Sequence, residues 1–265
     1  MCPICKSDSK YSLTTAKHGY EIFSCINEKC NHYYFKDFHP GQGVDEREEN
    51  NLKESDDNLK KFGDRNKKLL NYFIKNIGNK ERFTFMDFGS GVAHISRTFK
   101  NTLGERVKIL CFEPNKNLKG LYDQFYLKQI SDINEANEKY DLIYLIEVIE
   151  HLDNPLETLL QISKIMDNDT KLFITTPKAV NNINGDCYDN PSHIHFFTIN
   201  SLNYLLELNG LKKIKLKYIP EMYVFDSVKY KKERLKAIII NFLQILGYRP
   251  KFKFENHLTG FTQLK

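Results

Sequence analysis

The stretch that decides the fold is Met86-Asp87-Phe88-Gly89-Ser90-Gly91-Val92-Ala93. It combines the end of an apolar strand, an acidic residue and a tight turn with two glycines, and a helix-like run to Leu103 follows. Glycine lets the backbone turn sharply and approach a ligand closely. The free N–H groups at the start of the next helix can face that ligand. The stretch therefore predicts the first half of a nucleotide-type binding site in a Rossmann-like sheet.

From residue 82 onward, apolar runs of strand length alternate with helix-like segments, which predicts an α/β fold with a largely parallel sheet. Seven strands are expected, at Phe83–Phe88, Lys108–Phe112, Phe125–Ile130, Leu142–Ile146, Lys171–Thr175, Lys212–Tyr218 and Leu258–Leu264. Helices are expected at about 92–103, 116–123, 155–166 and 200–209. Thr198 or Asn200 is the expected N-cap of the last helix, and Gly210 ends it.

The sequence pattern divides the chain into three parts. Residues 1–35 carry four of the six cysteines and short polar and aromatic pieces, which favours a small separate module. Residues 36–80 combine a polar linker with a helix from Leu52 to Ile77, because apolar residues recur there at three- and four-residue steps. Residues 81–265 form the α/β domain, with an extra helix expected at about 226–246 between the last two strands.

Composition narrows the class of protein. The chain is 41% hydrophobic and 28% charged, which is typical of a soluble globular protein. Its longest apolar run, Ala237–Leu246, is too short to span a bilayer, and its start does not have the pattern of a signal peptide. We therefore expect a cytoplasmic protein. The net charge of +5 gathers in the C-terminal part. Such a basic face can bind a nucleotide, a glycan phosphate, nucleic acid or, through residues 226–253, a membrane surface; it can equally be a solvated helix face.

Two cysteine pairs near the start predict a metal site. They are Cys2-x-x-Cys5 and Cys25-x4-Cys30, and thiols in a reducing compartment favour metal over disulfide. Four thiolates at this kind of spacing suit a closed, structural Zn²⁺ site. The second pair has four intervening residues where two are more common, and nearby His32 could replace Cys30. The alternative is that the thiols are unconnected.

Acidic residues at strand ends predict how a nucleotide would be held. In a dinucleotide enzyme a third glycine stands three positions after the second, but here His94 occupies that position. Glu113 ends the second strand, where a carboxylate can accept hydrogen bonds from both ribose hydroxyls. Asp132 and Ile133 follow the third strand and could contact an adenine amine and ring. The alternative for Glu113 is an ordinary loop glutamate.

The segment Glu147-Val148-Ile149-Glu150-His151-Leu152-Asp153-Asn154-Pro155, after the fourth strand, makes the pattern specific. With the glycine turn, Glu113 and the later His193-Ile194-His195-Phe196-Phe197-Thr198, it resembles class I S-adenosylmethionine (SAM)-dependent methyltransferases of the ubiquinone-biosynthesis O-methyltransferase branch. The resemblance covers about 80–265 and implies that the seventh strand is antiparallel. The cysteine-rich start resembles the zinc modules that precede some methyltransferases of nucleotide-linked sugars.

The resemblance also implies roles for individual residues. Asp87, Gly89 and Gly91 would lie against the methionyl part of SAM, and Glu113 would hold the ribose. The implied positions near the cofactor are completed by Ser90, Asp132, Ile133 and Glu147. SAM is a strong methyl donor, so the protein has mainly to align an acceptor and remove a proton.

Several acidic and histidine residues could take part in that proton removal. Glu147, Glu150 and His151 stand at i, i+3 and i+4, so one helical turn would point them the same way, and His195 could return over the same pocket. Such a set suits Mg²⁺ or another divalent ion that lowers the pKa of a hydroxyl acceptor, as in related small-RNA 2′-O-methyltransferases. Alternatively His151, His193 or His195 is a metal-free general base. A third alternative is a purely structural role, in which Glu150 and His151 only cap and orient the turn.

The sequence therefore favours a methyltransferase that acts on a hydroxyl of a small polar or anionic acceptor, such as a sugar or a nucleotide-linked sugar. Its acceptor pocket would be shaped by Tyr188, Asp189, Asn190, Tyr223 and the 36–51 loop. Carbon or nitrogen methylation, RNA 2′-O-methylation and a non-catalytic binding protein are the alternatives. We expect no nucleic-acid partner, because no aromatic-basic RNA-binding module is evident. The position of His94 argues against a dehydrogenase.

Overall fold

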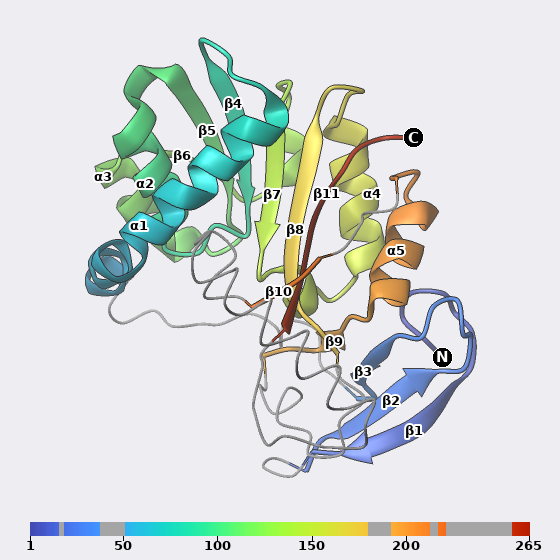
Figure 1. The fold of residues 1–265 in the computed structure, drawn as a ribbon. Helices are drawn as coiled ribbons and strands as arrows, with labels where there is room; N and C mark the ends of the chain where they lie inside the picture. Colours follow the sequence, from blue (N-terminus) through green and yellow to red (C-terminus); the bar gives the residue numbers. More distant parts are fainter. Residues whose placement is uncertain (16–18, 38–50, 180–191, 213–216, 221–255) are drawn as a thin grey trace, which may run out of the picture.

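The computed structural model describes residues 1–15, 19–37, 51–179, 192–212, 217–220 and 256–265. Its main sheet has the strand order β10-β11-β8-β7-β4-β5-β6 (Figure 1). The strands are β4 (Phe83–Phe88), β5 (Val107–Phe112), β6 (Lys128–Ile130), β7 (Leu142–Ile146), β8 (Lys171–Pro177), β10 (Lys217–Pro220) and β11 (Asn256–Thr262). The expected extra helix at 226–246 and the basic stretch 229–253 lie outside the described residues.

The main sheet is mostly parallel, as expected from the alternation of strands and helices. Strands β6, β5, β4, β7 and β8 pair in parallel. Strand β11 pairs antiparallel with both β8 and β10, so it runs against its neighbours. The carboxyl ends of β4, β5 and β7 therefore meet at one edge of the sheet, which is where ligands bind in open α/β folds.

Some boundaries differ from the expected ones. Strand β6 is shorter than the expected 125–130, because helix α3 (Lys119–Gln124) is followed by a turn at Phe125 and Tyr126. The Phe125 ring lies under the Arg97 guanidinium at 3.4 Å. Strand β11 begins two residues earlier than expected, and Leu264 instead forms an isolated bridge with Leu211. The beginning of the expected 212–218 strand falls partly on residues outside the described part of the chain.

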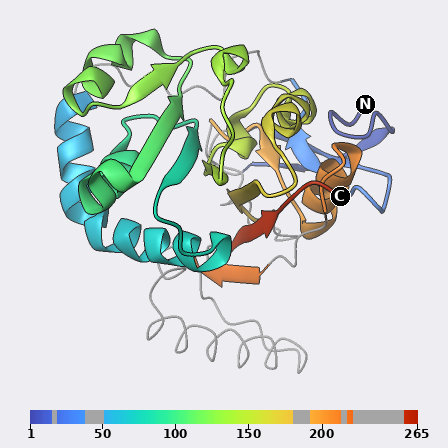
Figure 2. The same ribbon diagram turned by 90° about the horizontal axis from the view of Figure 1, so that it is seen from above.

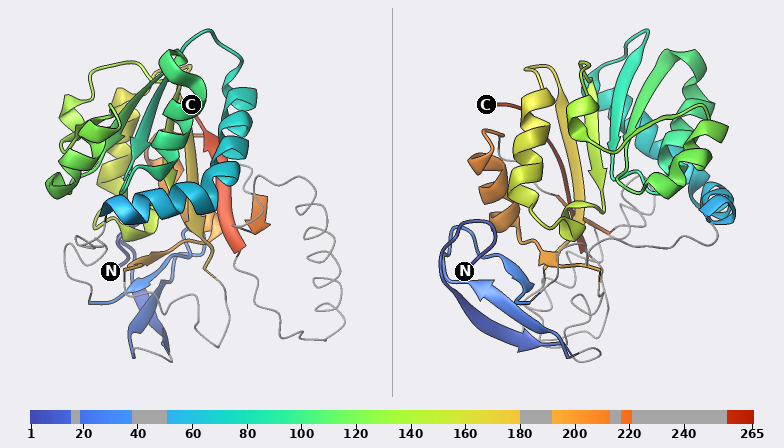
Figure 3. Two further views of the ribbon diagram at one scale, coloured as in Figure 1. Left: turned by 90° about the vertical axis from the view of Figure 1, so that its left-hand side faces the viewer. Right: turned by 180° about the vertical axis from the view of Figure 1, so that it is seen from behind.

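Helices cover both faces of the sheet. Helix α1 (Asn51–Ile77), α2 (His94–Leu103) and α3 pack on one face through an aromatic-rich core that includes Phe73, Phe85 and Phe99. Helix α4 (Pro155–Ile165) and α5 (Ile199–Leu208) pack on the other face, against residues such as Met86 and Ile143. In Figure 1, α1 lies in front of the sheet, and in the right-hand view of Figure 3, seen from behind, α4 lies in front of it. Figure 2 shows the layers from above.

The strand alternation places Asp87 on a definite face. Along β4, Phe83 and Phe85 belong to the core under α1 and α2, whereas Met86 and Phe88 belong to the core under α4 and α5. Since successive side chains point to opposite faces of a strand, Asp87 shares the face of Phe85. Its carboxylate therefore points toward α2.

A second, antiparallel sheet contains the N-terminal strands. We call it the N-terminal sheet, and its order is β1-β2-β3-β9. Its strands are β1 (Ser9–Thr14), β2 (Glu21–Cys25), β3 (Tyr33–Phe35) and β9 (His195–Phe196). Strand β9 comes from the chain after β8, so the N-terminal segment shares a sheet with a distant part of the sequence. Figure 1 shows this sheet beyond the arrowhead ends of β7 and β8.

The connection between the N-terminal sheet and α5 is short and capped. Thr198 is the N-cap of α5, as one of the two expected residues, and its hydroxyl accepts from the Ser201 backbone N–H at 3.0 Å. The same hydroxyl donates to the Asn31 carbonyl at 3.1 Å. One side chain thus begins the helix and holds the N-terminal segment against it. Within the described residues, no helix is long and apolar enough to span a bilayer.

Candidate functional site

The glycine turn after β4 has an unusual backbone. Gly89, Gly91 and Ala93 all have left-handed φ angles, of 72°, 50° and 56°. A Cβ at position 89 would lie 2.7 Å from the Val148 Cγ2 atom, so only glycine fits there. A Cβ at position 91 would meet nothing within 4 Å, so the backbone there borders open space. The backbone N–H of Gly89 donates to the Phe112 carbonyl at 2.8 Å and ties the turn to β5.

Glu113 and the glycine turn are brought together as the sequence predicts. One carboxylate oxygen of Glu113 accepts from the Gly91 N–H at 2.9 Å, and the other accepts from the Asn115 N–H at 3.0 Å. Its backbone carbonyl accepts from the Gln129 amide at 2.9 Å. The carboxylate is therefore fixed beside the open space at Gly91.

Tyr122 supports the turn from below and was missed by the sequence reasoning. Its hydroxyl donates to the Gly91 carbonyl at 2.6 Å and lies 2.7 Å from the Ser90 hydroxyl. The ring is fully buried, and burial raises the pKa of its hydroxyl. Only its place in the expected helix 116–123 could have pointed to this role. Residues 89–93, Glu113 and Tyr122 are called the glycine cradle below.

Asp87 precedes the glycine cradle and is held by hydrogen bonds in the protein interior. Its carboxylate accepts from the Ser96 hydroxyl at 2.6 Å, and Ser96 lies 3.0 Å from the Tyr144 hydroxyl. Burial raises the pKa of Asp87 to about 7, against the opposing effect of the Ser96 hydrogen bond. The carboxylate thus links the end of β4 to the first turn of α2, the helix that follows the cradle.

The residues expected near adenine follow β6. The Asp132 carboxylate accepts from the Asn134 backbone N–H at 2.9 Å and caps η3 (Ile133–Glu135). Asp132 is exposed, whereas Ile133 is buried in the core under α4. Their contact with an adenine stays a prediction.

Glu147 does not share a helical turn with Glu150 and His151. Its φ of 55° separates it from η4 (Ile149–His151), which is a single 3₁₀ turn. Its carboxylate accepts from the Thr175 hydroxyl at 2.6 Å, at the end of β8. The turn therefore presents two of the three expected groups.

The structure joins Glu150 and His151 to His193. One ligand atom from each of these residues lies within 4.8 Å of the others, and we call the three the histidine cluster. Glu150 is buried, and its carboxylate lies 3.9 Å from Nε2 of His151. Nδ1 of His151 lies 2.7 Å from the Ser192 carbonyl. A carbonyl can only accept, so Nδ1 carries the proton and Nε2 of the neutral ring is an acceptor on the Glu150 side.

His195 lies in the interior rather than in this cluster. It is 1% exposed, and its Nδ1 lies 3.1 Å from Nε2 of His32. Burial lowers the pKa of His195 to about 4, while the backbone of Leu152 and Asp153 raises it by hydrogen bonding. The structure thus places His193, and not His195, beside His151.

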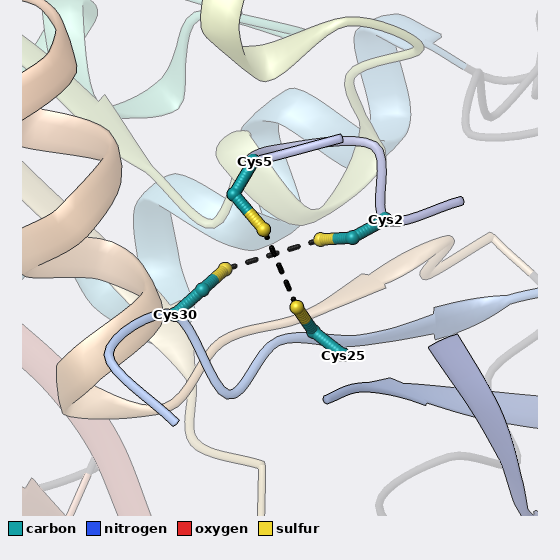
Figure 4. A group of neighbouring side chains, drawn as sticks. All are labelled: Cys2, Cys5, Cys25 and Cys30. Atoms are coloured by element: carbon teal, nitrogen blue, oxygen red, sulfur yellow. Dashed lines mark hydrogen bonds between the residues drawn. The ribbon is translucent and has the colours of Figure 1, made fainter. Parts of the chain in front are cut away.

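The four N-terminal cysteines converge (Figure 4). Their sulfur atoms lie within 4.8 Å of one another, with 3.9 Å between Cys2 and Cys30 and 3.3 Å between Cys5 and Cys25. Four thiolates at about 2.3 Å from a tetrahedral Zn²⁺ are about 3.8 Å apart, so the arrangement fits that ion. A hydrogen bond from Cys30 lowers the pKa of Cys2 to about 5, whereas burial raises the pKa of Cys25 to about 12 and the hydrogen bond to Cys2 raises that of Cys30, so a bound cation would have to stabilise the remaining thiolates. The group includes Cys30, so His32 does not replace it.

Comparison with known proteins identifies the family. Residues 49–216 match the family described as "Methyltransferase domain", and the chain belongs to that family. A search of the curated proteins finds no match.

Solved structures of similar fold include methyltransferases. The plantazolicin methyltransferase BpumL in complex with SAH has 15% identity and a TM-score of 0.52, over 80% of this chain and 88% of that one. The Haemonchus contortus phosphoethanolamine N-methyltransferase 2 in complex with SAM has 14% identity and a TM-score of 0.50, over 76% and 52%. A chain of the Haloferax volcanii complex between the Trm112 methyltransferase activator and a methyltransferase has 13% identity and a TM-score of 0.53, over 83% and 99%. At these identities the likeness concerns the fold.

Proposed function

We propose that this chain is a SAM-dependent methyltransferase that methylates a hydroxyl oxygen of a small polar acceptor, such as a sugar or a nucleotide-linked sugar. Membership of the methyltransferase-domain family supports the reaction class. Two structural neighbours are complexes with SAM or SAH, which supports the cofactor. The choice of a hydroxyl acceptor rests on the histidine cluster and on the resemblance described above.

One observation carries the cofactor proposal: the Glu113 carboxylate lies against the Gly91 N–H, at 2.9 Å, beside open space. A carboxylate in this position is matched to the two hydroxyls of a ribose. The third-glycine position of a dinucleotide site holds His94, which is too large for close helix packing. The cradle therefore favours SAM over NAD.

Calorimetric titration with SAM and with SAH tests the cofactor. We expect Glu113→Ala to weaken binding by about 10- to 100-fold, because a hydrogen bond to a charged group contributes about 1.5–3 kcal/mol. Glu105→Ala is the matched control, because the Glu105 side chain is 97% exposed and lies in η1 (Gly104–Arg106). Absence of SAM binding by the folded wild-type protein would refute the proposal.

His151 is proposed to accept the proton of the acceptor hydroxyl. When bound, SAM supplies an electrophilic methyl group to that oxygen. The hydrogen bond from Nδ1 to Ser192 holds the ring so that Nε2 is the basic atom. The Glu150 carboxylate, at 3.9 Å, stabilises the imidazolium that forms. The buried position of His195 makes it a less suitable base than His151 or His193.

The histidine cluster also fits a divalent cation, which is the second form of the proposal. One carboxylate and two imidazoles would hold the ion, and this donor set suits a transition-metal ion better than Mg²⁺. The ion would lower the pKa of a hydroxyl acceptor. Full activity after exhaustive chelation would exclude this form and leave the histidine base.

The four cysteines are proposed to hold one structural Zn²⁺. The site has no open position for a substrate, so its contribution is to the fold of the N-terminal segment. Elemental analysis of the purified protein should find about one zinc per chain, and Cys25→Ser should reduce this content. A zinc content near zero in folded protein would exclude the site.

A further inference from the structure

A pair of buried histidines joins the N-terminal sheet to the region of the histidine cluster. His32 lies between Cys30 and β3 and is fully buried, as is His195 in β9. Nε2 of His32 lies 3.1 Å from Nδ1 of His195, although 163 positions separate the two residues in the sequence. We call this hydrogen bond the histidine bridge.

The bridge couples the tautomers of its two rings. In a hydrogen bond between neutral imidazoles, one ring nitrogen donates its N–H and the other accepts. Nε2 of His32 and Nδ1 of His195 share one proton across 3.1 Å, so the tautomer of one ring determines the tautomer of the other.

The segment that leads into β9 runs beside the turn that carries Glu150 and His151. The Ile194 N–H donates to the Glu150 carbonyl at 3.0 Å, and the Ser192 carbonyl accepts from His151. The Ile194 carbonyl in turn accepts from the Phe35 N–H at 3.2 Å, at the end of β3. Residues 192–195 therefore contact the N-terminal sheet on one side and η4 on the other.

Strand β9 is short, and its pairing with β3 covers only two residue pairs, Tyr33 with Phe196 and Tyr34 with His195. Such a short ladder fixes the position of a loop weakly, because few backbone hydrogen bonds contribute. The histidine bridge adds a buried side-chain hydrogen bond at the end of that ladder. Its loss would leave a buried ring nitrogen of His195 without its partner, at a position two residues from His193.

We propose that His32 is a positioning residue for the histidine cluster: through the bridge to His195 it holds residues 192–195, and thus the His193 and His151 rings, in their relative places. The proposed catalytic role of the cluster gives this arrangement its functional meaning, so the inference rests on the proposed function in that respect. The N-terminal segment then contributes a residue to the organisation of the site as well as a metal-binding module.

Two variants at position 32 separate the hydrogen bond from the filling of space. His32→Leu keeps an apolar group of similar size in the pocket beside Phe197 but cannot form a hydrogen bond. His32→Gln keeps both an N–H donor and a carbonyl acceptor, so it can replace His32 in either direction of the bond. Tyr11→Phe is a control in the same sheet, because Tyr11 is exposed on β1 and bonds only locally to Thr14.

The readout is the set of imidazole ¹⁵N signals at fixed pH in protein labelled at its eight histidines, each assigned by single substitution. In the wild type, His195 and His151 should each show a single neutral tautomer. In His32→Leu we expect the His195 signals to average between tautomers and those of His151 and His193 to shift. His32→Gln should restore the wild-type pattern in large part, and Tyr11→Phe should leave it unchanged.

Titration with SAM distinguishes failure of this inference from failure of the proposed function. The glycine cradle does not contact the bridge, so SAM affinity should stay within about twofold of the wild type in each variant. Unchanged His151 and His193 signals in His32→Leu would overturn the inference. It would equally be overturned if both variants at position 32 lost SAM binding together, because His32 would then support the whole fold. If no protein binds SAM but the imidazole signals change as expected, the proposed function fails and the positioning role stands.

Discussion

The glycine cradle and the histidine cluster lie at the same edge of the main sheet but are assembled in different ways. The cradle follows directly from strand ends: the turn after β4 meets Glu113 at the end of β5 through a hydrogen bond of 2.9 Å. The cluster needs a segment that follows β8 and is held on its far side by the N-terminal sheet. Cofactor binding should therefore depend on local sequence, whereas the arrangement of the proposed catalytic groups should depend on long-range contacts.

The largest expected effect on catalysis, and the strongest test of this difference between the two sites, is at His151. His151→Asn removes the proposed base and should lower the turnover number by about 10²–10⁴-fold, which is the usual contribution of a general base. SAM affinity should change little, because the glycine cradle does not include His151. Transfer of labelled methyl from SAM, together with calorimetry, measures both quantities. If turnover is unchanged in His151→Asn, another residue must be the base, and the proposed difference between the two sites is wrong.

The next effect is on the pH dependence of stability and concerns Asp87. Burial holds its pKa at about 7 in the folded protein, above the usual aspartate value of 3.8. The folded state therefore binds more protons between these values, so this group's contribution to stability is present below about pH 4 and is lost as the pH rises to about 7. The loss amounts to about 1.4 kcal/mol per pH unit at most.

Asp87→Asn should remove this slope and raise the melting temperature most at pH 7–8, since asparagine can still accept from Ser96. Thermal unfolding from pH 4 to 8 measures the effect. Asp123→Asn, an exposed change on α3, is the control. Parallel pH curves for wild type and Asp87→Asn would contradict the assignment.

Gly89→Ala should have a somewhat smaller effect on stability. It combines a left-handed backbone with a 2.7 Å approach to Val148, and together these should cost about 2–3 kcal/mol. Gly91→Ala meets no atom within 4 Å, so it should cost only the backbone strain of about 1–2 kcal/mol. Gly120→Ala, in α3 with free space around it, should be neutral or stabilising. Denaturant unfolding of the three variants would test this order, which equal effects would contradict.

Tyr122→Phe is expected to have the smallest effect, about 1 kcal/mol, because it leaves the partly buried Gly91 carbonyl without its donor. SAM affinity should fall by a few-fold, since the turn loses a support but no cofactor contact. Tyr126→Phe is the control, because that side chain is 90% exposed. Calorimetry and unfolding that place both variants at the wild-type value would show that Tyr122 does not hold the turn.

The sequence allowed prediction of what depends on neighbouring residues. The strands at 83–88 and 142–146, the contact between Glu113 and the turn, and the gathering of the four cysteines all follow from short patterns. The choice of His193 over His195 did not, because it depends on where β9 begins and on the distant partner His32. The sequence also did not predict that Glu147 lies outside η4, because a single residue with a left-handed backbone does not change the periodicity of the sequence.

The late position of β9 in the sequence delays completion of the N-terminal sheet during protein synthesis. Strand β3 ends at Phe35, and its partner strand begins at His195, about 160 residues later. At about 5–20 residues per second, roughly 10 to 30 s pass during synthesis before the N-terminal sheet can be completed. During that time the edge of β3 lacks its partner strand, and an unpaired edge can pair with another chain. Early binding of a metal ion by the four cysteine thiols would order the nascent segment and reduce that risk.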